Sequence, residues 1–407
     1  MKNRWESKEL KAVSAISYGY TESASADPVG PRFLRITDIQ NDHVDWENVP
    51  YCKIAKGDLP KYRLERGDIV FARTGATTGK SFLVSDPPKD AVFASYLIRL
   101  RLLGKELLPE FVSLFFQTAG YWQAIKAGSS GSAQGGFNAT KLGALSIPLP
   151  PLPEQRRIVG ILDEAFDGIA TAKANAEKNL QNARALFESH LQAVFTERGA
   201  EWDRVTLATL LERGWIESHL DGNHGGDYPR KHEFISEGIP YISANCLDDE
   251  RIDITKAKHL SPARAALLRK GIARDGDVLF AHNATVGPVA ILRTDEEKVI
   301  LGTSLTYYRC NRGHILPEYL AHYMRSFGFK VQYLQVMRQS TRNQVPITKQ
   351  REFFHVIPPV DEQREIIRQL DGLFENGRRL ASIYQRKLTA LDELKKSLLH
   401  RAFSGQL

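Results

Sequence analysis

PPLPEQRRI occupies residues 150–158 of this chain and returns at residues 358–366 as PPVDEQREI, a shift of 208 residues. The same shift carries Leu108–Phe111 onto Leu316–Tyr319 and Thr140-Lys141 onto Thr348-Lys349. A period of this length is far beyond that of any solenoid repeat. It therefore predicts a duplicated domain with its connector, and approximate two-fold symmetry within the chain.

Each copy of the motif opens a segment that is typical of one long helix. Residues 153–197 and 361–403 have no proline beyond the first turn and few glycines. Pro153 suits a first helical turn because its missing N–H costs nothing there. Glu154 and Asp361 then lie at the positive end of the helix dipole.

The apolar residues of both helices follow the alternating spacing of four and three that is typical of a coiled-coil seam. We expect the seam to comprise Ile158, Leu162, Ala165, Ile169, Ala172, Ala176, Leu180, Ala183, Leu186 and Val194 in the first helix, and Ile366, Leu370, Leu373, Leu380, Tyr384, Leu388, Leu391, Leu394, Leu398 and Ala402 in the second. The alternative is that each helix lies on its own globule. At 1.5 Å per residue each helix is about 65 Å long, which exceeds what a globule of about 150 residues covers.

The direction of the helices follows from the symmetry. The first helix leaves the first globule and ends at the second, so its symmetry mate must run back. We therefore expect the helices to be antiparallel and Leu407 to finish near Met1.

The remaining residues predict two mixed α/β globules, at 1–150 and 200–358, with the long helices at 151–199 and 359–407. Short apolar runs at 68–72 and 277–281, in a background of glycine and proline, are typical of strands. One helix is expected in each globule, at 109–126 and 317–334.

Composition narrows the class of protein. The 407 residues include 55 Lys+Arg and 48 Asp+Glu, a net charge of +7 that is compatible with an anionic partner. Cys52, Cys246 and Cys310 form no CxxC pattern, so neither a disulfide framework nor a zinc site is supported. A reducing compartment fits best. No signal-peptide core or membrane-length apolar run is present, and we expect a cytoplasmic protein without a membrane partner.

One stretch resembles a phosphate-binding loop. Residues 75–81 read GATTGKS, but Thr74 occupies the position where the loop requires its first glycine. The second copy, ATVGP at 284–288, has proline in place of the lysine. Nucleotide hydrolysis is therefore not favoured. Both copies instead keep a strand that leads into a polar loop, at 73–79 and at 282–287.

A second pair of polar loops precedes the long helices, at 128–138 and 336–346. Their amide, hydroxyl and guanidinium groups are those that read base edges and phosphates. The alternative is that they are solvated turns. The two loops occupy equivalent positions of the repeat but carry different polar side chains. This difference favours recognition of two different ligands.

The sequence lacks the catalytic motifs of methyltransferases, metal-dependent nucleases and HExxH metalloenzymes. An amino-methyltransferase grips its flipped base with an Asn/Asp-Pro-Pro-aromatic loop, and Asp86-Pro87-Pro88-Lys89 lacks the aromatic residue. A metal-dependent nuclease needs clustered carboxylates, and Glu393 stands on a long helix without partners nearby in the sequence. The histidines show no HExxH spacing.

These features together resemble the specificity subunit of a type I DNA restriction-modification enzyme. The resemblance rests on residues 148–159, on the partner motif at 358–367, and on a Trp followed by an apolar stretch at 5–13 and 202–210. It implies two mixed α/β (α+β) target-recognition domains joined by two long antiparallel coiled-coil helices, in a pseudo-two-fold, circular organisation. One departure is a longer segment before Tyr241 than before Phe33.

The resemblance also implies a function. Such a subunit is not catalytic: each recognition domain reads one half of a split asymmetric target in duplex DNA, and the helix pair sets the spacing. It docks two modification subunits, which use S-adenosylmethionine, and two restriction subunits, which use ATP and magnesium. No cofactor or metal is expected on this chain itself. The alternatives are a stand-alone DNA methyltransferase or nuclease, which the missing catalytic loops argue against, and a coiled-coil scaffold.

The expected DNA-contacting residues lie mostly in the paired loops. In the first half they are Arg35, Arg73, Thr74, Thr77, Thr78, Lys80, Gln134, Asn138 and Lys141; in the second half they are Ser243, Asn245, His282, Asn283, Thr285, Arg338, Thr341, Arg342, Asn343, Gln344 and Lys349.

Overall fold

The computed structural model describes residues 5–40, 43–129, 136–196, 202–223, 228–248, 251–339 and 342–407. The chain separates into two compact units. Unit 1 comprises Met1–Glu177 and Gln385–Leu407, and unit 2 comprises Lys178–Tyr384. Each unit therefore contains one globule together with a part of both long helices.

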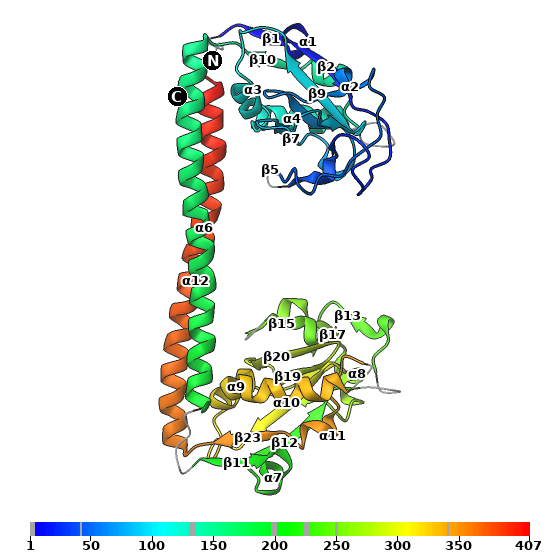
Figure 1. Ribbon diagram of the computed structural model, residues 1–407. Coiled ribbons are helices and arrows are strands. Elements are labelled where there is room, and N and C mark those ends of the chain that lie inside the picture. The colour runs from blue at the N-terminus through cyan, green and yellow to red at the C-terminus, as the bar shows by residue number, and fades with distance from the viewer. Residues whose placement is uncertain are drawn as a thin grey trace. The chain divides into compact units, whose positions relative to one another are not determined.

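The globule of unit 1 is built on an antiparallel four-stranded sheet. Its strand order is β2 (Ser14–Tyr18), β9 (Leu97–Leu102), β6 (Ile69–Ala72) and β7 (Ser81–Leu83). Figure 1 labels β2, β9 and β7 in this globule. Every residue of β6 is buried, as expected for a central strand that is apolar on both faces. The strand predicted at 68–72 is confirmed.

Short elements surround this sheet. They are β1 (Ser7–Glu9), α1 (Leu10–Val13), β3 (Phe33–Leu34), β4 (Ile39–Gln40), β5 (His43–Val44), α2 (Leu59–Tyr62), β8 (Val92–Phe93), α3 (Pro109–Phe115), α4 (Ala119–Ser129), α5 (Ala139–Gly143) and β10 (Ser146–Pro148). Strand β1 pairs with β10, β3 with β8, and β4 with β5.

Unit 2 repeats the four-stranded sheet in the same order. The strands are β12 (Ile216–Asp221), β22 (Leu305–Cys310), β19 (Val278–Asn283) and β20 (Thr285–Ile291). A five-stranded sheet accompanies it, in the order β13 (Phe234–Ile235), β17 (Lys258–Leu260), β14 (Ile239–Ile242), β21 (Val299–Leu301) and β18 (Ile272–Ala273). The longer segment before Tyr241 supplies β13.

The other elements of unit 2 follow the order of unit 1. They are β11 (Asp203–Thr206), α7 (Leu207–Glu212), β15 (Leu247–Asp248), β16 (Arg251–Ile252), α8 (Pro262–Ala266), α9 (Pro317–Arg325), α10 (Phe327–Arg338), α11 (Ile347–Gln350) and β23 (Phe354–Ile357). Strand β11 pairs with β23, as β1 pairs with β10 in unit 1.

The prediction of one helix in each globule is wrong, because each is broken into two. Between α3 and α4, the Thr118 hydroxyl donates to the Phe115 carbonyl and accepts from the Tyr121 N–H. Between α9 and α10, Ser326 has an extended backbone with φ −66° and ψ 157°. At Thr118, local side-chain bonds of this kind compete with a continuous helix.

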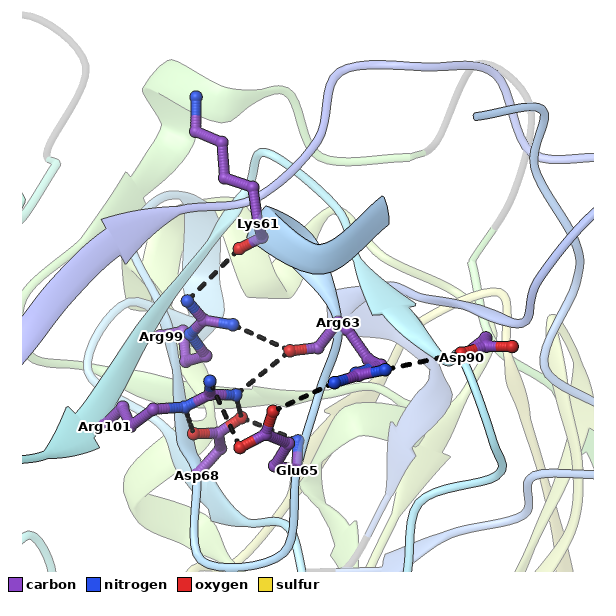
Figure 2. Close-up of polar contacts among 7 residues, drawn as sticks. All are labelled: Lys61, Arg63, Glu65, Asp68, Asp90, Arg99 and Arg101. Atoms are coloured by element: carbon purple, nitrogen blue, oxygen red, sulfur yellow. Dashed lines mark hydrogen bonds and ion pairs between the residues drawn. The ribbon is translucent and has the colours of Figure 1, made fainter. Parts of the chain in front are cut away.

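A buried arginine–aspartate pair recurs in the two sheets. Arg101 on β9 binds Asp68 through two nitrogens, both at 2.7 Å, and Asp68 is 1% exposed (Figure 2). Arg309 on β22 binds Asp277 in the same way, at 2.9 and 2.7 Å. A pair held by two parallel hydrogen bonds fixes the orientation of the arginine and aspartate side chains relative to each other. Figure 2 also shows Arg99, which donates to the Arg63 carbonyl at 2.8 Å and so ties β9 to the loop before β6.

The two long helices are α6 (Leu152–Thr196) and α12 (Val360–Phe403). In unit 1, Ile158 and Leu162 share a core with Leu399 and Ala402. Further along α6, the Phe166 ring lies 4.6 Å from the Lys395 Nζ, and Lys173 forms an ion pair with Asp392. Residue numbers rise along α6 while those of its partners fall, so the helix segments of unit 1 are antiparallel.

The helix segments of unit 2 are also antiparallel. The backbone of Ala183 lies beside Gly377, and the ring of Phe187 lies 5.4 Å from that of Phe374. The end of α6 then enters the globule, where Phe195 contacts Tyr319 and Tyr323.

The predicted seam is wrong at several positions. Leu186, Leu380 and Leu394 are 63%, 42% and 47% exposed, whereas Leu399, which the heptad pattern omits, is 3% exposed. A straight helix has 3.6 residues per turn, so a strict spacing of 3.5 drifts off the contact face over such a length.

The C-terminus lies against the core of unit 1. Leu407 and Trp5 pack on the same cluster, and Arg157 donates a hydrogen bond to the Leu407 backbone oxygen at 2.7 Å. Met1, whose proximity to Leu407 is expected from the sequence, lies outside the described residues. Across the described part of the chain, no helix is both long enough and apolar enough to span a bilayer.

Candidate nucleic-acid interface

The two polar loops of unit 1 meet at Arg73. Its backbone N–H donates to the Tyr96 carbonyl at 3.2 Å, and its own carbonyl accepts from the Phe137 N–H at 2.9 Å. Phe137 is buried and packs 5.8 Å from Phe71. Asn138 follows at the surface, where its side chain caps α5 by accepting from the Lys141 N–H at 2.9 Å. Loops that are distant in sequence thus form one edge of the globule.

Two exposed tyrosines contact Arg73, Tyr18 through its ring and Tyr96 through its backbone, and neither was expected from the sequence. The Tyr18 ring centre lies 5.0 Å from the Arg73 guanidinium, and Tyr18 is 41% exposed. Tyr96 is 62% exposed. Open aromatic faces beside a guanidinium can stack on bases and contact phosphates. Tyr18 ends β2 and Tyr96 directly precedes β9, so both are far in sequence from the two polar loops.

The turn after β6 is not a phosphate-binding loop. Gly75–Thr77 form a 3-10 helix, and strand β7 follows it where a phosphate-binding loop has a helix. Gly79 has φ +95°, and a Cβ there would lie 2.9 Å from Ile125 and Trp122, so only glycine fits. Thr74, Thr77 and Thr78 are half-buried, and Lys80 is exposed.

The two polar loops of unit 2 are joined more tightly. The Ala284 N–H donates to the Asn343 carbonyl at 3.0 Å, and the Asn343 side chain donates back to the Ala284 carbonyl at 2.6 Å. Asn283 and Gln344 form an isolated antiparallel bridge. Ala284 has φ +64°, which is strained for a residue with a side chain and is held by these bonds. Asn283, Thr285, Asn343 and Gln344 are thus brought together.

His282 differs from the expectation that its side chain faces a ligand. It is 3% exposed, and its Nδ1 lies 2.9 Å from the Val345 carbonyl. Burial lowers the pKa of His282, which favours the neutral ring. The side chain supports the loop from inside the globule.

The other expected residues are more scattered. Arg35 is bound to Asp38 through two nitrogens at 3.1 and 2.7 Å, and Lys349 is paired with Glu352 at 2.9 Å. The Lys141 ammonium donates to the Gly128 carbonyl at 2.6 Å. The exposed or half-buried remainder comprises Ser243, Asn245, Arg338 and Arg342. Gln134 and Thr341 lie outside the described residues.

The electrostatic and chemical character of this edge suits binding better than catalysis. Guanidinium, amide, hydroxyl and aromatic groups contact nucleic acids through phosphates, base edges and base faces. Among the residues that the structure describes, no group of three or more His, Cys, Asp or Glu is arranged to hold a metal ion.

Comparison with known proteins identifies the kind of protein that has this arrangement. Residues 2–181 match the family model of the type I restriction modification DNA specificity domain. The chain is 23% identical to the putative type I restriction enzyme MjaX specificity subunit of Methanocaldococcus jannaschii, over 99% of this chain and 93% of the relative. It is also 23% identical to the EcoBI specificity subunit of Escherichia coli, over 71% of this chain and 64% of the relative.

Two solved structures share the fold. A chain from a study of complex assembly and conformational transition of the type I R-M system superposes with a TM-score of 0.76, at 21% identity and covering 99% of this chain and 98% of that one. The HsdS subunit of Thermoanaerobacter tengcongensis gives 0.58, at 20% identity over 99% and 97%. Residues 2–181 therefore belong to the family of type I restriction modification DNA specificity domains, and the whole chain is similar in sequence and fold to type I restriction enzyme specificity subunits.

Proposed function

We propose that each unit reads one half of a split, asymmetric target in duplex DNA through its paired polar loops. The single observation that carries this proposal is that the two units share a backbone hydrogen bond between their polar loops but differ in the side chains around it. In both units a residue at the end of the central strand accepts a backbone hydrogen bond from the segment before α5 or α11: Arg73, directly after β6, at 2.9 Å, and His282, next to last in β19, at 2.8 Å. The side chains around that bond differ, as two different half-sites require.

In unit 1 the reading group comprises Arg73, Thr77 and Asn138, with Tyr18 and Tyr96 beside them. Arginine binds guanine or phosphate with two nitrogens, and the tyrosines supply faces for stacking. In unit 2 it comprises Asn283, Arg342, Asn343 and Gln344. Amide side chains suit adenine, whose major-groove edge offers one donor and one acceptor.

The chain itself is the recognition component of such an enzyme and is not catalytic, as its specificity domain and its similarity to specificity subunits indicate. The alternative of a stand-alone methyltransferase or nuclease is not favoured.

The long helices would act as the ruler between the half-sites. Their antiparallel segments in each unit support a pseudo-two-fold, circular organisation in which both units offer the same docking surface. Two modification and two restriction subunits would then bind. S-adenosylmethionine, ATP and magnesium would belong to those partners, with none bound by this chain.

Selection of random duplexes tests the proposal. The chain is assembled with its modification subunits, incubated with labelled random DNA, and the retained molecules are sequenced. The expected result is one motif of two unlike parts separated by a fixed gap. A single continuous motif, or no enrichment over a sample without this chain, would contradict it. The isolated chain serves as the control for catalysis and should transfer no labelled methyl group to DNA.

A further inference from the structure

A buried polar network lies directly behind the reading loop of unit 2. Gln350, the last residue of α11, is 0% exposed. Its Oε1 lies 3.1 Å from the His219 Nε2, 3.0 Å from the Thr306 hydroxyl and 3.1 Å from the Tyr308 hydroxyl. Its Nε2 donates to the Val345 carbonyl at 3.2 Å. One amide thus links strands β12 and β22 to the loop.

The bonding partners fix the proton positions in this network. A carbonyl oxygen can only accept, so the Gln350 Nε2 must face Val345 and its Oε1 must face the donors. His219 then carries its proton on Nε2. His282 carries its proton on Nδ1, since it too lies against the Val345 carbonyl, at 2.9 Å. Val345 is therefore held by Gln350 from one side and His282 from another.

The hydroxyl of Thr306 has a second neighbour, the Phe280 carbonyl at 3.4 Å. The contact with Gln350 is the shorter at 3.0 Å and is the better hydrogen bond. The rings of His219 and His355 are neutral at pH 7, because burial lowers the pKa of His219 to about 3 and that of His355 to about 4. The network therefore introduces no buried charge.

In unit 1, apolar side chains occupy the positions that correspond to this polar network. Its sheet register makes Ile16 the counterpart of His219 and Leu100 the counterpart of Tyr308. By the same comparison Ile98 corresponds to Thr306, and Leu142 to Gln350. All four side chains of unit 1 belong to one hydrophobic cluster. The fold can therefore be completed without any polar group at these positions.

We propose that Gln350 is a positioning residue for the second half-site, acting with His219 and Thr306 to hold the backbone at Val345 and so aim residues 342–344. This inference rests on the proposed function. A buried amide costs free energy unless its oxygen and its nitrogen both find partners, as they do in Gln350, and the bonded amide then favours one arrangement of the groups around it. In unit 2 that arrangement ends on the loop that carries Asn343 and Gln344, which lie two residues and one residue before the anchored Val345 carbonyl.

The experiment uses the full chain assembled with its modification subunits. Methylation rates are measured on four duplexes: the matched target, targets with one substitution in either half-site, and one with both. Gln350→Met keeps the length of the side chain and removes its hydrogen bonds. Leu142→Met is the matched variant at the equivalent position of unit 1.

A loosened loop should lower discrimination at the second half-site by about tenfold, the effect expected for losing a buried hydrogen bond or two. Discrimination at the first half-site should not change. Leu142→Met should leave both unchanged. A second pair of variants refines the test, since Thr306→Val removes the hydroxyl at nearly constant shape and should lower second-site discrimination, whereas Thr306→Ser should restore it.

Unchanged second-site discrimination in Gln350→Met would overturn the inference, as would an equal loss at both half-sites. A fall in melting temperature with discrimination intact would assign Gln350 to stability alone and would also overturn it. Failure of the proposed function is distinguishable, because the unmodified chain would then show no two-part target at all.

Discussion

The side-chain oxygen of Gln155 accepts a hydrogen bond from the backbone N–H of Leu108 at 2.8 Å. Gln363 makes the same bond to Leu316 at 2.9 Å, and both glutamines are 0% exposed. Each amide also donates to two backbone carbonyls. These acceptors are Glu106 and Pro150 in unit 1, and His314 and Pro358 in unit 2. The repeated motif therefore fastens the start of each long helix to its globule.

Replacing Gln155 with methionine should destabilise unit 1. The change removes three hydrogen bonds and leaves the Leu108 N–H and two carbonyls without a side-chain partner, at a cost of about 2–4 kcal/mol. The measurement is the urea unfolding of unit 1 within the full chain. Gln385→Met, at an exposed glutamine in the part of α12 that belongs to unit 1, is the control and should change it by less than about 0.5 kcal/mol. Equal effects of the two substitutions would refute the anchoring role.

Unit 2 should lose stability as the pH falls from 7 to 5. Burial lowers the pKa of His219 to about 3 and that of His355 to about 4. Below pH 6.5 the unfolded state binds protons that the folded state excludes, so stability falls with pH. Each histidine should cost about 2 kcal/mol by pH 5. His355→Ile, which copies Ile147 of unit 1, should flatten the dependence by that amount in calorimetric melts. An unaltered pH slope would contradict this account.

Sequence patterns predicted the mixed globules, the central strands and both long helices because each depends on local periodicity. They could not predict the break at Ser326 or the exposure of Leu186, since both depend on what packs nearby. The features of the candidate site also fall into those that the sequence indicated and those that it did not. Polar composition indicated the loops that meet at Arg73 and Ala284. The inward turn of His282 and the approach of Tyr18 are set by tertiary contacts, which a linear pattern does not contain.

Tyr96→Ala should weaken binding to DNA that carries the first half-site. An exposed aromatic ring that stacks on a base contributes about 1–3 kcal/mol. Tyr96→Phe keeps the ring and should bind as the unmodified chain does. Leu103→Ala, an exposed residue beyond the opposite end of β9, is the control for loss of surface apolar area. Fluorescence anisotropy on the assembled methyltransferase measures the affinity. If Tyr96→Ala and Leu103→Ala behave alike, Tyr96 does not contact the target.

The spacing between half-sites should depend on the long helices. Removing seven residues from α6 and the seven that face them in α12 keeps the seam in register and shortens each helix by about 10 Å. The preferred gap should then shrink by about three base pairs at 3.4 Å each. Methylation of duplexes with graded gaps measures it. Removing seven residues from α6 alone is the control and should abolish methylation, because the facing contacts no longer match. An unchanged preferred gap would show that the helices are not the ruler.

A fragment of residues 1 to about 200 should pair with a second copy of itself. In the full chain Ile158 and Leu162 pack on Leu399 and Ala402 of α12, which the fragment lacks. An apolar seam left open on a long helix is unstable in water, and a second α6 running in the opposite direction would cover it across a two-fold axis. Such a dimer contains two copies of the first recognition domain. With modification subunits present it should methylate an inverted repeat of the first half-site in place of the asymmetric target.

Light scattering at micromolar concentration gives the mass, and Ile158→Glu with Leu162→Glu should keep the fragment monomeric. A monomeric unmodified fragment, or a dimer without preference for the inverted repeat, would rule out the antiparallel two-fold arrangement.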